Sequence, residues 1–158
     1  MSSGEEKGRY IEEVGLALES LGLPRMLGRI LGALLVADPP EMSADQLATT
    51  LRASLGTISV STRALEDLAL IERLRKPGDR KAYFRLRPGS WHRLAQERAD
   101  AFVKALGVAE RGLRVLDSDK PEVRRSLEEM LDFMQFIENE YSTLLARWER
   151  KLAEQGRS

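Results

Sequence analysis

The sequence of 158 residues contains no cysteine and a single histidine, His92. Without cysteine the chain has no disulfide framework, no thiolate ligand for zinc or an iron–sulfur cluster, and no thiol nucleophile. One histidine argues against a histidine-rich metal site and against a Ser-His-Asp triad. Because the sequence also lacks a nucleophile–base pair, metal-ligand spacing and a Gly-rich phosphate loop, we expect no enzymatic activity, no metal and no cofactor.

Long hydrophobic runs are missing as well. The longest apolar run, residues 30–37, has 8 residues and includes a glycine, whereas a membrane span needs about 20. The first seven residues show no basic region followed by an apolar run, so we expect no secretory signal. With 42% hydrophobic and 32% charged residues, the chain is able to build a core. We therefore expect a soluble, cytoplasmic protein without a membrane partner.

The chain also lacks net charge, since 25 basic side chains balance 25 acidic ones. The balance is uneven along the chain: residues 1–42 carry 4 basic and 7 acidic side chains, residues 43–90 carry 9 and 5, and residues 91–158 carry 12 and 13. A local excess of cations is typical of a surface that binds phosphate groups. Random clustering of surface charge is the alternative explanation for the basic middle segment.

Apolar residues at spacings of three and four predict two helices before residue 42, one over residues 10–21 and one over residues 26–35. Pro24 is suited to the first turn of the second helix, where a missing N–H costs little. Gly28 and Gly32, four residues apart, predict close packing of that helix against a neighbour.

Two capping signals follow. Ser43 and Gln46 have the spacing of a capping box, which predicts a short helix over residues 44–52. Ser54 is placed to cap a second helix over residues 55–68. The apolar period of this second helix puts a set of small and polar residues on its outer face, and they are the predicted DNA contacts of the helix. These contacts are Ser54, Gly56, Thr57, Ser59, Val60 and Arg63.

Beyond residue 68 the apolar period shortens toward two. Residues 70–75 and 81–87 are predicted strands, joined by a turn over residues 76–80. Between residues 73 and 87 the hairpin carries seven cations and one acid. Predicted DNA contacts of the hairpin are Arg75, Lys76, Asp79, Arg80 and Lys81. The alternative is a solvated basic edge that deters aggregation of the sheet.

The last third is predicted to be helical over about residues 91–116 and 122–154. From residue 122 to residue 154 there is neither glycine nor proline, and apolar residues alternate at spacings of four and three. The positions of this heptad seam are Val123, Leu127, Met130, Met134, Ile137, Tyr141, Leu144 and Trp148. Such a seam predicts a dimer interface, to which Tyr10 and Val14 of the first helix are added. Packing of the long helix on the chain's own N-terminal helices is the alternative.

These elements predict a fold that is mainly α with a small β-hairpin. Residues 43–90 form a winged helix-turn-helix, which is flanked by supporting N-terminal helices over residues 1–42 and by dimerisation helices over residues 91–158. In this arrangement the second helix of the pair enters the major groove of DNA, and the hairpin reaches the minor groove or the phosphates. Arg63 is the expected base or phosphate contact, and Arg80 lies at the hairpin turn.

The run from residue 47 to residue 86, with Leu70-Ile71 and the turn Pro77-Gly78-Asp79-Arg80-Lys81, resembles the winged helix of MarR-type transcriptional regulators. Residues 22–32 and the late helix are similar to the GbsR/MarR-like branch. The resemblance, which covers residues 8–152, implies a homodimer on a pseudo-palindromic operator and a wing-tip pair at Asp79 and Arg80. It also implies a small-molecule effector, which the sequence does not identify. Two departures are Ala69, where the family often has glycine, and Lys81 in place of arginine.

The sequence thus predicts a dimeric, sequence-specific regulator of transcription that binds double-stranded DNA and is expected to act as a repressor. The alternative is a winged-helix module for protein interaction, whose coiled-coil helix docks a partner and whose wing binds an acidic protein surface.

Overall fold

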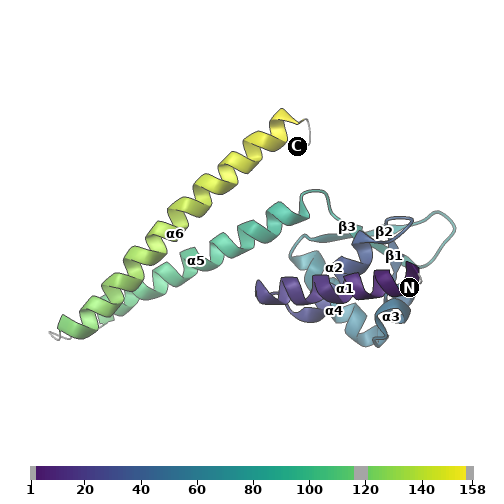
Figure 1. The fold of residues 1–158 in the computed structure, drawn as a ribbon, viewed down its shortest axis with the longest axis horizontal. Coiled ribbons are helices and arrows are strands. Elements are labelled where there is room, and N and C mark those ends of the chain that lie inside the picture. Colours follow the sequence, from purple (N-terminus) through teal and green to yellow (C-terminus); the bar gives the residue numbers. More distant parts are fainter. Residues whose placement is uncertain (1–2, 116–120, 156–158) are drawn as a thin grey trace. The chain divides into compact units, whose positions relative to one another are not determined.

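The structure, a computed structural model, describes residues 3–115 and 121–155. The chain forms two compact units, residues 1–93 and residues 94–158. The elements follow one another as α1–α2–β1–α3–α4–β2–β3–α5–α6 (Figure 1). The predicted fold class, mainly α with a small β-hairpin, is confirmed, and the sheet gains a short third strand.

Helices α1 (Ser3–Ser20) and α2 (Arg25–Leu35) pack closely against each other. A Cβ atom placed on Gly28 would lie 3.0 Å from the Cα atom of Gly15, and one on Gly32 would lie 3.2 Å from the Cα atom of Ile11. The close packing expected from the two glycines is therefore confirmed. Pro24 is the N-cap residue of α2 rather than part of its first turn.

The helix-turn-helix consists of α3 (Ala44–Leu51) and α4 (Leu55–Asp67). The capping box is confirmed. The backbone amide of Gln46 donates to the Ser43 hydroxyl at 3.2 Å, and the backbone amide of Ser43 donates to the Gln46 side-chain oxygen at 2.7 Å. The Ser54 hydroxyl caps α4 by accepting the Thr57 amide at 3.1 Å. Both helices contribute fully buried residues to the core of the first unit. These residues are Leu47, Leu51, Ile58, Thr62 and Leu65.

The sheet is antiparallel, with β3 (Ala82–Leu86) between β2 (Ile71–Arg75) and β1 (Met42–Ser43). In the hairpin Ile71 lies opposite Leu86 and Arg75 lies opposite Ala82, which confirms the predicted strands to within one residue at every end. Strand β1 was not predicted, because two residues are too few to show an alternating period. It joins Ser43, the N-cap of α3, directly to Tyr83 of the wing.

The connection from α4 to β2 passes through the left-handed region of backbone space at Ala69, where φ is 55°. The Leu70 amide donates to the Leu65 carbonyl and the Ala69 amide to the Glu66 carbonyl, which closes the C-terminus of the helix. Glycine adopts this backbone conformation without a steric penalty. The departure from the family pattern therefore falls on a position whose backbone favours glycine.

The second unit contains α6 (Pro121–Glu154) and most of α5 (Ser90–Val115). The two helices touch where the rings of Phe102 and Tyr141 lie 5.6 Å apart, and again where Gly112 faces Leu127. Helix α5 is continuous through both of its inner glycines. Residues 116–120, which include most of the gap between the two predicted helices, lie outside the described residues. Within the described part of the chain no helix is both long and apolar enough to cross a membrane.

Candidate nucleic-acid interface

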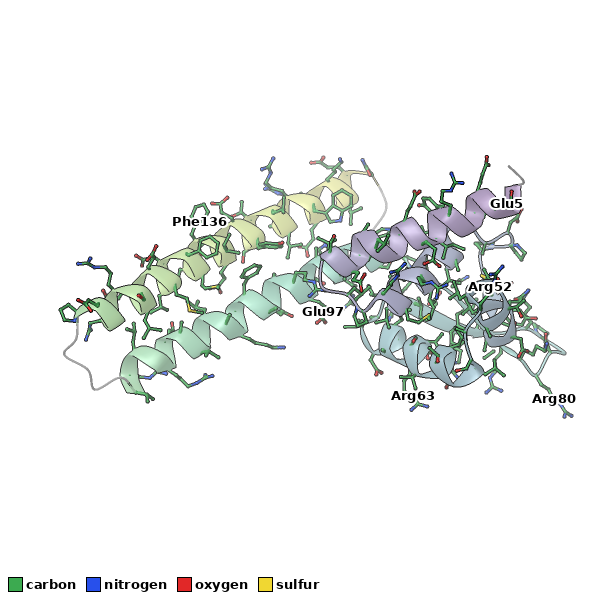
Figure 2. All side chains as sticks on the ribbon, turned by 60° about the horizontal axis from the view of Figure 1, so that its bottom comes forward. Glu5, Arg52, Arg63, Arg80, Glu97 and Phe136 are labelled. Atoms are coloured by element: carbon green, nitrogen blue, oxygen red, sulfur yellow. The ribbon has the colours of Figure 1, made fainter. Side chains whose placement is uncertain are left out.

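The outer face of α4 is open to solvent. Gly56, Thr57, Ser59, Val60 and Arg63 are all exposed, whereas Ile58 and Leu65 face the core. Val60 exposes 71% of its surface, which is unusual for an apolar side chain on a helix that packs in a core. Figure 2 shows Arg63 projecting away from the body of the unit. This face of α4 is thus accessible to a ligand as large as a DNA duplex.

Not every hydroxyl of α4 faces that surface. Ser54 and Thr57 are exposed, yet their side-chain oxygens lie 2.8 Å apart in a hydrogen bond within the cap. Ser61 is buried, and so is Thr62, whose hydroxyl donates to the Ile58 carbonyl at 2.9 Å. The hydroxyls of this helix are therefore divided between the cap, the core and the exposed face.

The hairpin cations fall into two groups. Four of them form ion pairs within the chain. These pairs are Arg73–Glu66, Lys76–Glu41, Lys81–Asp45 and Arg85–Glu72. Arg75, Arg80 and Arg87 are exposed, and no ion pair joins them to any other residue that the structure describes. Among the hairpin residues predicted to touch DNA, Arg75 and Arg80 thus present a free guanidinium, while Lys76 and Lys81 are already neutralised by an acid.

The turn of the hairpin is held by Asp79. Its carboxylate accepts the Lys81 amide at 2.8 Å and the Tyr83 hydroxyl at 2.8 Å. These two hydrogen bonds lower the pKa of Asp79, and the same carboxylate raises the pKa of the Tyr83 hydroxyl. Arg80 lies between the two anchored residues and points outward (Figure 2). The turn therefore exposes one cation on a backbone that is fixed on either side.

Sequence reasoning missed three residues of this region, namely Glu41, Asp45 and Tyr83. Glu41 and Asp45 hold the two wing lysines, and their pairing raises the pKa of Lys76 and of Lys81. Their separation of more than 30 positions from these lysines leaves no local signal. Tyr83 could have been found, because an alternating strand with Phe84 in the core places its neighbour on the opposite face.

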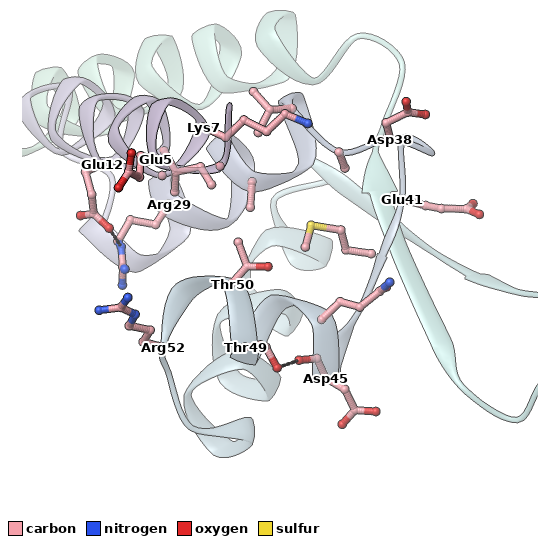
Figure 3. A pocket seen from close by; sticks show the side chains of 18 of the residues that line it. Glu5, Lys7, Glu12, Arg29, Asp38, Glu41, Asp45, Thr49, Thr50 and Arg52 are labelled. Carbon is pink, nitrogen blue, oxygen red and sulfur yellow. Dashed lines mark hydrogen bonds and ion pairs between the residues drawn. The ribbon is translucent and has the colours of Figure 1, made fainter. Parts of the chain in front are cut away.

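A cleft of about 1020 Å³ opens between α1, the end of α2 and α3 (Figure 3). Arg29 bridges its floor by donating to the Glu12 carboxylate at 2.7 Å and to the Leu51 carbonyl at 3.0 Å. Although burial pushes the pKa of Glu12 upward, the hydrogen bonds from Arg29 and Arg25 hold it below its usual value. Charges of both signs line the cleft. These residues are Glu5, Lys7, Glu12, Arg29, Asp38, Glu41, Asp45 and Arg52.

The residues predicted for the dimer interface occupy different environments. Of the heptad seam, Leu127, Met134, Ile137 and Tyr141 are half-buried within their own unit, whereas Met130, Leu144 and Trp148 are exposed. Val123 lies at a position whose side chain the structure does not describe. In α1, Tyr10 is exposed, while Val14 packs against Gly32 of α2. Phe133 and Phe136, beside the seam, expose more than half of their surface. Phe136 is labelled on α6 in Figure 2.

The part of the chain that the structure describes contains no group of three or more acidic or histidine side chains placed to hold a metal ion.

A capped helix-turn-helix followed by a basic hairpin whose turn exposes an arginine defines a winged-helix protein of the DNA-binding class.

Comparison with known proteins places the chain within this class. The family profile of MmpR5-like MarR family transcriptional regulators matches residues 89–154. The chain is 41% identical over 145 residues to the HTH-type transcriptional regulator MmpR5 of Mycobacterium tuberculosis (strain ATCC 25618 / H37Rv). This match covers 92% of this chain and 88% of that protein. A crystal structure of a transcriptional regulator, also 41% identical, matches 92% of this chain and 99% of that chain with a TM-score of 0.76.

The chain therefore belongs to the MmpR5-like MarR family of transcriptional regulators. The predicted MarR-type resemblance and the predicted regulatory, DNA-binding function are confirmed. The assignment to the GbsR/MarR-like branch stays a prediction, and so does the role of each named site residue.

Proposed function

We propose that the protein is a homodimeric repressor whose α4 and wing read a pseudo-palindromic operator in double-stranded DNA. The observation that carries this proposal is the position of Arg63, Arg75 and Arg80, three exposed cations without an ion pair among the described residues, on α4 and the hairpin. Free guanidinium groups release counterions when they meet phosphates, and they form bidentate contacts with guanine. The other predicted contacts of α4 surround Arg63 on the same exposed face.

The dimeric part of the proposal rests on the apolar surface of α6. A helix of 34 residues is about 50 Å long. It exposes Phe133, Phe136 and Leu144, each with more than half of its surface open. A second copy of the same helix pair is the simplest partner for such a surface, because a two-fold interface buries the same patch on both chains. The half-buried members of the seam support the helix from within its own chain.

The remaining parts of the proposal follow from this activity. Repression requires only that bound protein blocks transcription, and a small-molecule effector would release it. A regulator of this kind acts where the chromosome lies, so we place it in the cytoplasm and assign it no catalytic activity.

Selection of duplexes from a random pool with the full chain tests this proposal. We expect an enriched pseudo-palindrome with half-sites about one helical turn apart, roughly 34–36 Å. Fluorescence anisotropy on the enriched duplex, in rising salt, then gives its affinity, and repeating it with candidate ligands identifies an effector. A chain that enriches no sequence and binds an acidic protein instead would favour the protein-interaction module.

A further inference from the structure

Tyr83 lies at the centre of a polar network that spans the wing. Its hydroxyl donates to Asp79 in the turn, and the Lys76 ammonium lies 4.2 Å from the centre of its ring. Lys76 also forms an ion pair with Glu41, which precedes β1. Lys81 forms an ion pair with Asp45 in the first turn of α3. The network therefore connects the turn of the hairpin with the segment that begins the helix-turn-helix.

The backbone of Tyr83 strengthens this connection. Tyr83 belongs to the central strand β3, opposite Leu74 of β2 on one side and Ser43 of β1 on the other. Ser43 is the N-cap residue of α3. Because Phe84 occupies the core face of the strand, the Tyr83 ring stands on the opposite face of the sheet, where it meets the Lys76 ammonium.

We infer that Tyr83 is a positioning residue for DNA binding: through Asp79 it holds the wing turn so that Arg80 is presented to the duplex. This inference rests on the proposed function and deepens it. The carboxylate has two oxygens, one used by the Lys81 amide and one by the Tyr83 hydroxyl, so the residues on both sides of Arg80 are anchored. Anchoring removes backbone freedom that would otherwise be lost when DNA binds.

Tyr83→Phe is the sharpest test, because it removes one hydroxyl while the net charge of the chain and the ring that faces Lys76 stay the same. We expect affinity for the enriched duplex to fall about three- to tenfold, which is the net range of a typical hydrogen bond in a protein. The same change in an Arg80→Ala background should have little further effect, because the residue being positioned is gone. Equal thermal midpoints for the wild type and Tyr83→Phe would show that the fold is kept.

Asp79→Asn provides a second variant, with Asp67→Asn as its control. Both changes remove one negative charge from the same unit, and Asp67 is exposed at the end of α4. General electrostatics predicts that losing an acid strengthens DNA binding. We expect Asp79→Asn to bind at least about threefold more weakly than Asp67→Asn, because one oxygen acceptor cannot replace the two used by the carboxylate.

Limited trypsin digestion without DNA tests the anchoring of the turn separately from DNA binding. Cleavage after Arg80 or Lys81, followed by mass spectrometry, should be several-fold faster in Tyr83→Phe and in Asp79→Asn than in the wild type, because a released turn enters the protease more readily. If the wild type binds no duplex, the proposed function fails, while this digestion still reports on the turn.

Three results would overturn the inference. They are unchanged DNA affinity in Tyr83→Phe, equal losses with and without Arg80, and unchanged cleavage at the turn in both variants.

Discussion

A Cβ atom on Gly28 of α2 would lie 3.0 Å from the Cα atom of Gly15 of α1 and 3.2 Å from its carbonyl oxygen. Both neighbours are backbone atoms, so a methyl group at this position can be accommodated only if the two helices move apart. The crossing of α1 and α2 therefore depends on two glycines that face each other. It also sets the position of α2, which supplies fully buried residues to the core of the first unit.

Gly28→Ala tests this crossing. Alanine is the better helix former by about 1 kcal/mol, yet we expect the free energy of unfolding to fall by about 1–3 kcal/mol because of overpacking. Gly8→Ala in α1 is the matched control, since nothing lies within 4 Å of its added Cβ, and it should leave stability equal or higher. Urea unfolding followed by circular dichroism measures both. An increase in stability for Gly28→Ala would contradict the observed packing.

Arg63 and Arg80 should differ in what they contribute to recognition. Arg63→Ala should relax the base preference at one position of each half-site, because a bidentate contact to a base is lost. Arg80→Ala should weaken binding to all duplexes alike and reduce the salt slope by about one unit for each protomer. Competition with single-base variants of the enriched duplex separates the two effects. Binding that is unaffected by Arg80→Ala at moderate salt would contradict the wing assignment.

The wing lysines should matter less for DNA than Arg80 does. Lys76 and Lys81 are already paired with Glu41 and Asp45, so a phosphate must displace a carboxylate before it gains the lysine. We expect Lys76→Ala and Lys81→Ala each to reduce the salt slope by less than Arg80→Ala does, that is, by well under about 0.9 for each protomer. Anisotropy titrations over a series of salt concentrations measure the three slopes side by side. Equal slopes would show that the lysines leave their acids on binding.

The exposed apolar residues of α6 should control assembly. Phe136 exposes 59% of its surface, so Phe136→Asp should leave the helix intact while placing a charge in the proposed interface. We expect the wild type to sediment as a dimer at micromolar concentration and Phe136→Asp to sediment as a monomer. Gln135→Asp, at the adjacent exposed position, is the control for the added charge. A wild type that sediments as a monomer would remove the dimer from the proposal.

Ala69→Gly should stabilise the protein. With φ at 55°, Ala69 adopts a backbone conformation that costs an L-residue roughly 1–2 kcal/mol and glycine almost nothing. We expect the free energy of unfolding to rise by up to about 1 kcal/mol, because the greater freedom of glycine in the unfolded chain offsets part of the gain. Ala64→Gly, inside α4, should lower it by about 1 kcal/mol. Thermal unfolding of the two variants gives opposite shifts if this is correct.

Local interactions made most of the winged helix predictable. The capping box at Ser43 and Gln46 depends on residues three positions apart, and the alternation in residues 70–75 and 81–87 needs only the period of a strand. Both were confirmed because capping and amphipathic periods operate over a few residues. The two-residue strand β1 was missed, because its only support is pairing with β3, some forty positions away.

The sequence by itself determined that the chain is a helix-rich protein with a basic wing, since charge, caps and apolar periods are written along the chain. It also determined that Arg80 lies at the turn of that wing. Only the tertiary structure decided which cations remain free. Glu41 and Asp45 neutralise Lys76 and Lys81 from positions distant in sequence. Ion pairs of this kind depend on distance in space, which a linear pattern does not contain.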